Sequence, residues 1–296
     1  MSDKVKVFEL PVSEIPPVGT LLYIGRTGSG KTSAILNTLY QIKDQFSLVK
    51  VLCGSESTCE LYRKHIPSAH VEFLDNWDRS TASKFKGWVD RLEKINGKES
   101  DPLKKARAVI IMDDLAYLGK IIAKDPTFAR LLYNGRHPGV LFMLSLQYTK
   151  VIGPQYRSQI HRVFCSVENN PGNRRKIYDE FNPCFGEFDE FDRVMVACTR
   201  NYEVLVLKTT QSKSAEVKDN CWLMRTQWPL PDFKMMPYDG SWEINPESQH
   251  ERLLDKEQRG NKGSEHVVLK NYRKARKPKN RRNRKSLSKR TSHKRR

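Results

Sequence analysis

The feature that most constrains the fold is a glycine-rich turn, GRTGSGKT, at residues 25–32. It satisfies the pattern G-x-x-x-x-G-K-[ST] in full, and chance produces that pattern in only about 1 in 100 chains of this length. The apolar run TLLYI (20–24) precedes the turn, and apolar residues spaced for one helix face follow it from Thr32 to about Phe46. The sequence therefore predicts a strand, a glycine turn and a helix in direct succession.

The residue types in this turn suit the phosphates of a nucleotide. Glycines let successive backbone N–H groups converge on phosphate oxygens, and the helix N-terminus adds partial positive charge. Lys31 would neutralise the β- and γ-phosphates, and the Thr32 hydroxyl would ligate magnesium. We therefore predict a P-loop that binds ATP and Mg²⁺ through Gly25, Arg26, Thr27, Gly28, Ser29, Gly30, Lys31, Thr32 and Ser33.

A P-loop needs a second magnesium anchor on a neighbouring strand, and the segment AVIIMDDL at 108–115 supplies one. Its apolar residues predict a strand that has Asp113 and Asp114 at its end. We expect Asp113 to hold magnesium, directly or through water. Asp114 takes the position where many P-loop ATPases carry a glutamate that orients the attacking water. As an alternative, Asp114 caps the helix that follows the strand.

Further short apolar runs predict strands separated by helical or loop segments. They lie at 48–53, 71–74, 108–112, 140–146, 161–167, 193–198 and 202–208. Because the central runs are continuously apolar rather than alternating, they fit strands covered on both faces, as in parallel sheets. The closing pair around TRN (199–201) instead predicts a C-terminal β-hairpin. We expect an α/β fold with a mostly parallel central sheet flanked by helices.

Composition divides the chain into four parts. Residues 1–19, marked by prolines, predict an extended lead-in, and residues 20–218 predict the P-loop ATPase domain. An irregular layer is expected at 219–265 and a disordered basic tail at 266–296. Lys270 to Arg296 holds 15 Lys or Arg and no Asp or Glu, out of a net charge of +19. Such a tail predicts a polyanionic partner (DNA or RNA), a nuclear import receptor, or both.

No apolar run approaches the roughly 20 residues that span a bilayer, and no signal-peptide core follows the N-terminus. We therefore expect neither export by a signal peptide nor a membrane span. The six cysteines form no C-x-x-C pair, and several lie in apolar segments where a reduced thiol acts as a small core residue. This pattern favours a reducing intracellular compartment over a structural zinc site.

Three classes of P-loop protein compete for the function. For a nucleotide kinase, NWDRS (76–80) only faintly resembles the Asp-Arg pair of deoxynucleoside kinases, and no arginine-rich lid segment is clear. A GTPase would be expected to show Asn-Lys-x-Asp, but Asn261-Lys262 is followed by Gly-Ser. The third class is a nucleic-acid motor, on which the segment GRHPGVLFMLSLQY at 135–148 bears directly.

This segment is similar to the part of FtsK/HerA-superfamily ATPases in which an arginine precedes a glycine-started strand ending in glutamine. Within that superfamily, MDDL, GRHPGV, SLQY and PQYRSQIHRVF look like the viral branch. That branch contains the genome-packaging ATPases of poxvirus-like and other large DNA viruses and of related transposons. The resemblance covers about residues 18–210. Asp114 departs from the superfamily pattern, because cellular members of the superfamily usually have glutamate at this position.

The resemblance implies a RecA/FtsK-like sheet in which the strand before Gln147 lies between the P-loop strand and the Asp113 strand. Gln147 would then face the γ-phosphate as a sensor. Arg136 would reach the γ-phosphate of a neighbouring subunit as an arginine finger, with Arg157 as the rival candidate. The plainer alternatives are a solvated helix-end cation for Arg136 and a strand-end hydrogen bonder for Gln147.

The function implied is an ATP-driven translocase that packages double-stranded DNA into a viral capsid, with Lys31, Asp114, Gln147 and Arg136 in catalysis. The expected partners are double-stranded DNA, capsid or portal components and further copies of the chain in a hexameric or pentameric ring. The expected location is the host nucleus, a cytoplasmic virus factory or the virion. The alternatives are a basic nucleic-acid-binding structural protein that binds nucleotide without turnover, and a P-loop nucleotide kinase.

Overall fold

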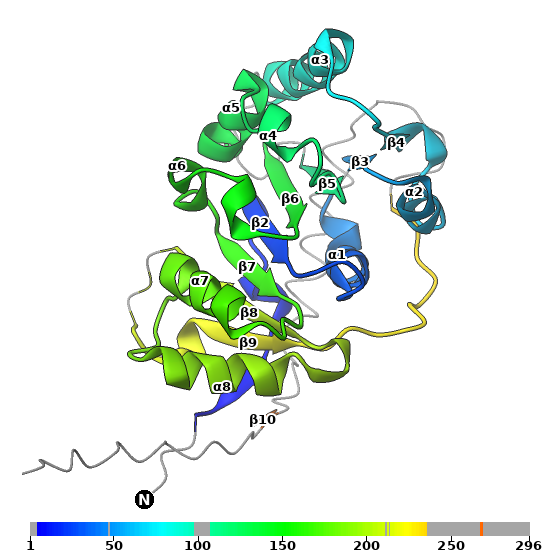
Figure 1. The fold of residues 1–296 in the computed structure, drawn as a ribbon. Coiled ribbons are helices and arrows are strands. Elements are labelled where there is room, and N and C mark those ends of the chain that lie inside the picture. Colours follow the sequence, from blue (N-terminus) through cyan, green and yellow to red (C-terminus); the bar gives the residue numbers. More distant parts are fainter. Residues whose placement is uncertain are drawn as a thin grey trace, which may run out of the picture.

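A ten-stranded sheet organises the chain (Figure 1). The structure, a computed structural model, describes residues 5–46, 48–97, 107–210, 212, 214–235 and the backbone of 267–268. The strands are β1 (Val7–Glu9), β2 (Gly19–Ile24), β3 (Leu48–Cys53), β4 (Val71–Phe73), β5 (Ala108–Asp113), β6 (Val140–Leu146), β7 (Arg162–Cys165), β8 (Val204–Lys208), β9 (Cys221–Met224) and β10 (Val267–Val268). Their order across the sheet is β10-β1-β9-β8-β7-β2-β6-β5-β3-β4.

The six strands from β7 to β4 in this order run parallel to one another. β6 lies between β2 and β5, which is the arrangement that the resemblance implied. Because the carboxyl ends of parallel strands share one edge, the turn after β2, the end of β5 and the residue after β6 meet there. The predicted α/β class with a mostly parallel central sheet is confirmed.

Helices cover both faces of the sheet. They are α1 (Lys31–Ile42), α2 (Glu56–Arg63), α3 (Arg79–Asn96), α4 (Gly119–Ile122), α5 (Pro126–Asn134), α6 (Pro154–Arg157), α7 (Pro171–Phe181) and α8 (Phe188–Cys198). Residues of α1 and α2 share one apolar cluster with Leu21 and Tyr23 of β2. Residues of α3, α5, α7 and α8 share the other cluster with Leu22 and Ile24. Successive strand residues alternate between faces, so the continuous apolar run of β2 is buried on both.

The strand predicted for residues 193–198 is wrong, because helix α8 occupies this part of the chain. Its buried residues recur at helical spacing and join the apolar cluster that also contains α7: Phe191, Val194, Met195 and Cys198. The hairpin predicted around 199–201 is therefore wrong as well. The antiparallel part of the sheet is formed instead by β8, which pairs with both β7 and β9.

Strands also lie in the two parts of the chain expected to flank the core. β1 falls within residues 1–19 and β9 within 219–265, and the two strands pair in parallel. The predicted tail, 266–296, lies outside the described residues apart from the backbone of β10. The four-part division of the chain stays a prediction.

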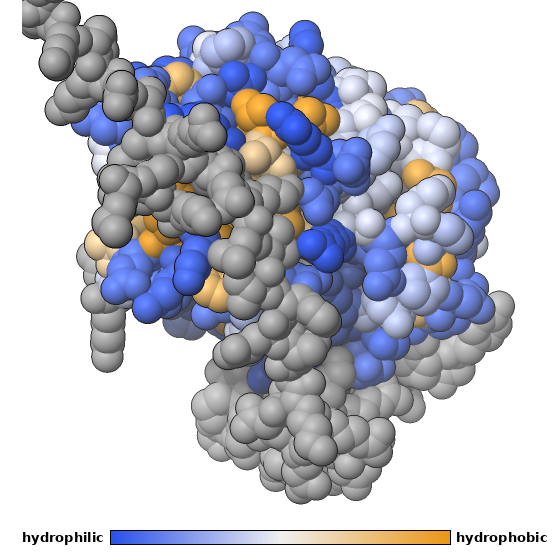
Figure 2. Space-filling model, turned by 90° about the horizontal axis from the view of Figure 1, so that it is seen from below, coloured by the Kyte–Doolittle hydropathy of each residue, from blue (hydrophilic) through white to orange (hydrophobic). Residues whose placement is uncertain are grey.

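Hydrophilic side chains dominate the face of the molecule in Figure 2, where hydrophobic side chains form small separate patches. The large apolar side chains of β2, β5 and β6 are instead buried in the two clusters. Within the part of the chain that the structure describes, no helix is long and apolar enough to cross a membrane.

Candidate nucleotide-binding site

The turn between β2 and α1 has the backbone that its glycines predict. Gly28 and Gly30 have φ angles of 76° and 89°, in the left-handed region that glycine enters without steric cost. A Cβ atom on Gly25 would lie 2.4 Å from Ser29 Oγ and 2.8 Å from the Cβ atom of Ser166. The loop therefore closes tightly against the end of β7. Its tip, 26–28, is exposed.

Lys31 begins α1 and points its amine back into the loop. The Nζ atom donates hydrogen bonds to the backbone carbonyl oxygens of Gly25 at 2.8 Å and Arg26 at 3.0 Å. The residue is only 9% exposed. Burial lowers the pKa of Lys31, while the nearby charges of Asp113 and Asp114 oppose that shift. A cation held at the mouth of a glycine loop is positioned to exchange these carbonyl contacts for phosphate oxygens.

Asp113 ends β5 and is almost fully buried, at 1% exposed. Its Oδ2 atom accepts hydrogen bonds from the Thr32 hydroxyl at 2.8 Å and the Tyr62 hydroxyl at 2.9 Å. Its Oδ1 atom is buried with no hydrogen-bond partner among the described residues. A buried carboxylate oxygen of this kind calls for a further positive partner. Magnesium prefers hard oxygen ligands, so the Thr32 hydroxyl and the Asp113 carboxylate fit this ion.

Tyr62 of α2 is a member of this cluster that the sequence did not single out. Burial raises the pKa of the Tyr62 phenol well above its usual value, and the charge of Asp113 acts in the same direction. The phenol therefore stays protonated and remains a donor to Asp113. A tyrosine on a helix 51 residues away carries no local signal of this contact.

Asp114 has a left-handed backbone, with φ 58°, which is uncommon for a residue other than glycine. The next helix, α4, has Leu118 at its N-cap position, so the alternative role of Asp114 as the cap of that helix is wrong. Its side chain is partly exposed and close enough to Lys31 to influence that amine. Asp114 thus projects from the strand end beside the P-loop lysine.

Gly54, directly after β3, accommodates this strained turn. Its N–H donates to the Asp113 carbonyl at 3.0 Å, and a Cβ atom on Gly54 would lie 1.9 Å from the Asp114 carbonyl oxygen. No side chain fits there without displacing the backbone that carries both aspartates. The sequence signal was a glycine after an apolar run, which is too common to be specific.

Replacing Gly54 with alanine is expected to lower the free energy of unfolding by about 2–4 kcal/mol, because backbone must move to admit the methyl group. The matched control is Gly87→Ala in α3, where an added Cβ atom meets nothing within 4 Å. That change should raise stability by about 0.5–1 kcal/mol, since alanine favours helix. Urea unfolding measures both, and equal midpoints for the two variants would contradict the close approach at Gly54.

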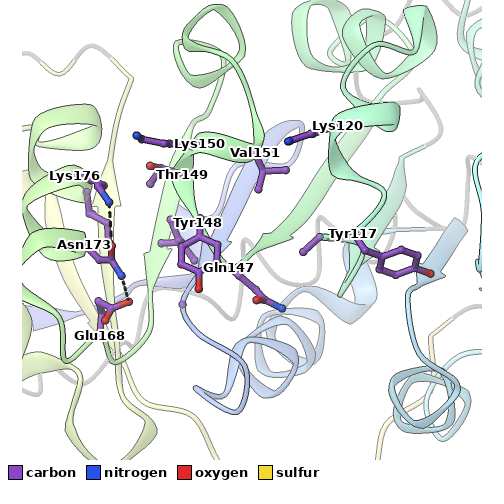
Figure 3. A pocket seen from close by; sticks show the side chains of 14 residues that line it. Tyr117, Lys120, Gln147, Tyr148, Thr149, Lys150, Val151, Glu168, Asn173 and Lys176 are labelled. Carbon is purple, nitrogen blue, oxygen red and sulfur yellow. Dashed lines mark hydrogen bonds between the residues drawn. The ribbon is translucent and has the colours of Figure 1, made fainter.

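Gln147 follows β6 at the same edge of the sheet. The Gly25 N–H donates to the Leu146 carbonyl at 3.2 Å, which ties the start of the P-loop to the residue before Gln147. Gln147 and Gly25 line a cleft of about 470 Å³ (Figure 3). Lys120, Lys150 and Lys176 also line it together with one carboxylate, Glu168, so the lining has a net positive charge. Gln147 therefore lies beside the P-loop, as the resemblance implied.

Arg136 lies at the opposite edge of the sheet, before β6 begins, so it does not belong to the same site within one chain. Its Nη2 atom is 2.9 Å from His161 Nε2, and the Thr20 N–H donates to His161 Nδ1 at 3.1 Å. Burial and the charge of Arg136 lower the pKa of His161. A neutral imidazole has one acceptor nitrogen, so it cannot satisfy both donors. Arg136 is exposed and weakly held.

Arg157, the rival candidate, is held firmly by its own chain. Its Nη1 atom lies 2.9 Å from Glu180 Oε1, and the two side chains are 17% and 16% exposed. Its Nε atom also donates to the Ile152 carbonyl at 3.2 Å. A largely buried ion pair of this kind is costly to break. Between the two arginines, Arg136 is therefore the exposed one, and Arg157 is the one that is ion-paired within its own chain.

The β2 turn, the α1 lysine and the buried acid against Thr32 define this protein as a P-loop NTPase fold with a candidate nucleotide site. The chain belongs to the family described as Poxvirus A32 protein, whose profile matches residues 19–177, more than half of its length. This match confirms the resemblance to the viral genome-packaging branch of the FtsK/HerA superfamily.

Several other proteins are similar to this chain. Uncharacterized protein 088R of Invertebrate iridescent virus 3 is 28% identical over 187 residues, which cover 63% of this chain and 68% of that relative. The structure of EssC (ATPases 2 and 3) from Geobacillus thermodenitrificans is similar with a TM-score of 0.50 and 13% identity, covering 89% and 50% of the two chains. The genome packaging NTPase B204 from Sulfolobus turreted icosahedral virus 2, in complex with ATP-gammaS, matches with a TM-score of 0.49 and 16% identity, covering 71% and 98%.

Proposed function

We propose that this protein is an ATPase that hydrolyses ATP with Mg²⁺ at the edge where β2, β5 and β6 end. The observation that carries the proposal is the pairing of Thr32 with the buried Asp113, whose second oxygen has no partner among the described residues. A hydroxyl next to the P-loop lysine, paired with a buried carboxylate, forms a magnesium-binding arrangement that a purely structural turn does not need.

Each side chain in this set has a separate task. Lys31 and the loop N–H groups neutralise and orient the β- and γ-phosphates. Thr32 and Asp113 hold Mg²⁺, which when bound would offset the charge of the transferred phosphoryl group. Asp114 orients the attacking water from its partly exposed position, and Gln147 hydrogen-bonds to the γ-phosphate without adding charge.

We further propose that hydrolysis drives double-stranded DNA into a viral capsid. Membership of the Poxvirus A32 protein family and the motif order support this task. The basic tail supports a polyanionic partner, because 15 positive charges without a negative one attract nucleic acid phosphates. The proposed assembly is a hexameric or pentameric ring that contacts capsid or portal components. Its proposed location is the nucleus or a cytoplasmic virus factory of an infected cell, or the virion.

The rate of ATP hydrolysis with and without duplex DNA tests this proposal. A DNA-driven motor should hydrolyse ATP faster when duplex DNA is present, whereas a structural protein that only binds nucleotide should show no turnover. A nucleotide kinase should instead turn over only when a second phosphate acceptor, such as a nucleoside monophosphate, is added. Absence of ATP hydrolysis by the wild-type chain with DNA and Mg²⁺ would contradict the proposal that the protein is a DNA motor.

The exposed position of Arg136 leads to a prediction about mixed rings. Arg136→Ala subunits lack the finger and Lys31→Ala subunits lack a working P-loop, so each alone should be nearly inactive. In an equal mixture, about a quarter of sites should pair an intact P-loop with a neighbour's Arg136 and regain hydrolysis. Steady-state ATPase assays of the mixture measure this recovery. The control is the parallel mixture of Arg157→Ala with Lys31→Ala subunits. Arg157 pairs with Glu180 within its own chain, and Arg157→Ala subunits keep Arg136, so they should hydrolyse ATP without a second variant. Normal turnover by Arg136→Ala alone would remove the assignment.

A further inference from the structure

The short connection between α8 and β8 sets an exposed aromatic ring against the P-loop. Tyr202 is 63% exposed, yet its Cδ1 atom would lie 3.2 Å from a Cβ atom placed on Gly30. Gly30 is the N-cap residue of α1 and directly precedes Lys31. The tyrosine ring therefore lies in contact with the end of the loop where α1 begins, with much of its surface open to solvent.

The backbone at this connection is strained. Asn201 and Tyr202 have φ angles of 55° and 60°, so two successive residues other than glycine occupy the left-handed region. Tyrosine is uncommon there, and such conformations persist only where surrounding contacts impose them. Strained residues of this kind gather at ligand sites, where they hold a side chain in an orientation that relaxed backbone would not give.

The contacts that impose this conformation lead back to the P-loop helix. The Thr226 hydroxyl donates to the Tyr202 carbonyl at 2.8 Å. The next residue, Gln227, is clamped to α1, because its N–H donates to Asn37 Oδ1 at 2.8 Å and its carbonyl accepts from Asn37 Nδ2 at 3.3 Å. Asn37 is buried, at 3% exposed. The helix that follows the P-loop thus positions, through two residues, the ring that lies against the P-loop.

The ring lies on the far side of the loop from the proposed γ-phosphate site. Asp113 and Gln147 approach the P-loop from the β5 and β6 side of β2, whereas Tyr202 precedes β8, on the β7 side. A triphosphate with its γ end near Asp113 and Gln147 would run past Gly30 and place its other end toward Tyr202. We propose that the Tyr202 ring is the platform on which the base of the bound nucleotide stacks, an inference that rests on the proposed function. A flat exposed aromatic face suits any base, and purines offer it the larger contact area.

Calorimetric titration of two ligands in the presence of Mg²⁺ tests this inference: ATP-γ-S, and inorganic tripolyphosphate, which has the phosphates but neither the ribose nor the base. Tyr202→Asn removes the ring and keeps a residue that tolerates a left-handed backbone. It should weaken ATP-γ-S binding about 10-fold, and tripolyphosphate binding by less than about 2-fold. Tyr202→Phe keeps the ring and should bind both ligands like the wild type. Tyr133→Ala, in α5 at the opposite edge of the sheet, is the control for loss of a partly exposed tyrosine.

Three results would overturn the assignment. They are unchanged ATP-γ-S affinity in Tyr202→Asn, an equal loss for ATP-γ-S and tripolyphosphate, and a loss of duplex DNA binding with nucleotide affinity intact. The last would make Tyr202 a contact to nucleic acid. Failure of the proposed function has a different signature, because a wild-type chain that binds ATP-γ-S but never hydrolyses ATP would disprove the ATPase and leave the base platform standing.

Discussion

Replacing Lys31 with alanine is expected to reduce ATP hydrolysis by at least about 100-fold, the usual cost of removing one preorganised charge from a transferring phosphoryl group. The Lys31 amine lies inside the loop, within 3.0 Å of two backbone carbonyl oxygens, and other described lysines near the loop, such as Lys120 and Lys150, lie across the cleft. Among the described residues, no other lysine hydrogen-bonds to these loop carbonyls. Steady-state phosphate release measures the loss.

The fold should tolerate the Lys31→Ala change. Burial lowers the pKa of Lys31, so the folded protein already holds this cation at a cost in desolvation. The thermal midpoint should accordingly change by only a few degrees, which separates a catalytic defect from unfolding. Lys43→Ala, directly after α1 and partly exposed, is the matched control and should hydrolyse ATP normally. Retention of half the wild-type rate by Lys31→Ala would contradict the assigned role.

Asp113→Asn is the second change with a large expected effect. It keeps the size of the side chain and an oxygen for the Thr32 and Tyr62 hydroxyls, but it removes the negative charge that magnesium requires. Hydrolysis should fall about 100-fold at a Mg²⁺ concentration that saturates the wild type. The Mg²⁺ dependence of the initial rate should shift to higher concentration, which a purely structural defect would not produce.

Tyr62→Phe separates the charge of Asp113 from its hydrogen bonds. This variant removes one donor to Asp113 Oδ2 and leaves the carboxylate and Thr32 in place. Hydrolysis should fall by about 10-fold, the low end of the usual cost of removing a hydrogen-bond partner from a metal ligand, since the magnesium ligands remain. If Asp113→Asn keeps the wild-type Mg²⁺ dependence, the metal is held elsewhere, and Asp114 becomes the candidate anchor.

Local sequence patterns predicted the elements that carry the site. A continuously apolar run such as TLLYI can be buried on both faces only in a covered strand, and GRTGSGKT requires left-handed glycines between that strand and a helix. Both predictions needed only neighbouring residues. The order of β2, β6 and β5 across the sheet did not follow from such patterns, and it was available only through the family resemblance.

Helix α8 shows where pattern reading failed. The short window RVMVAC contains β-branched and apolar residues that fit a strand, and the expected hairpin followed from it. A window that begins at Phe188 reveals apolar residues at 188, 191, 194, 195 and 198, which is helical spacing. Six residues are too few to distinguish the two periods, whereas eleven suffice.

The sequence by itself determined that the chain has a P-loop, an acidic strand end and a mostly parallel sheet, because each follows from residues close together along the chain. Only the tertiary structure decided which distant groups meet. Tyr62 donates a hydrogen bond to Asp113, 51 residues away along the chain, and Tyr202 contacts Gly30 although 172 residues separate the two. It also decided that Arg157 is held by Glu180 while Arg136 remains exposed. Such contacts depend on strand order and helix packing, which are set by burial of the whole core. The local sequence around the residues in contact therefore does not predict them.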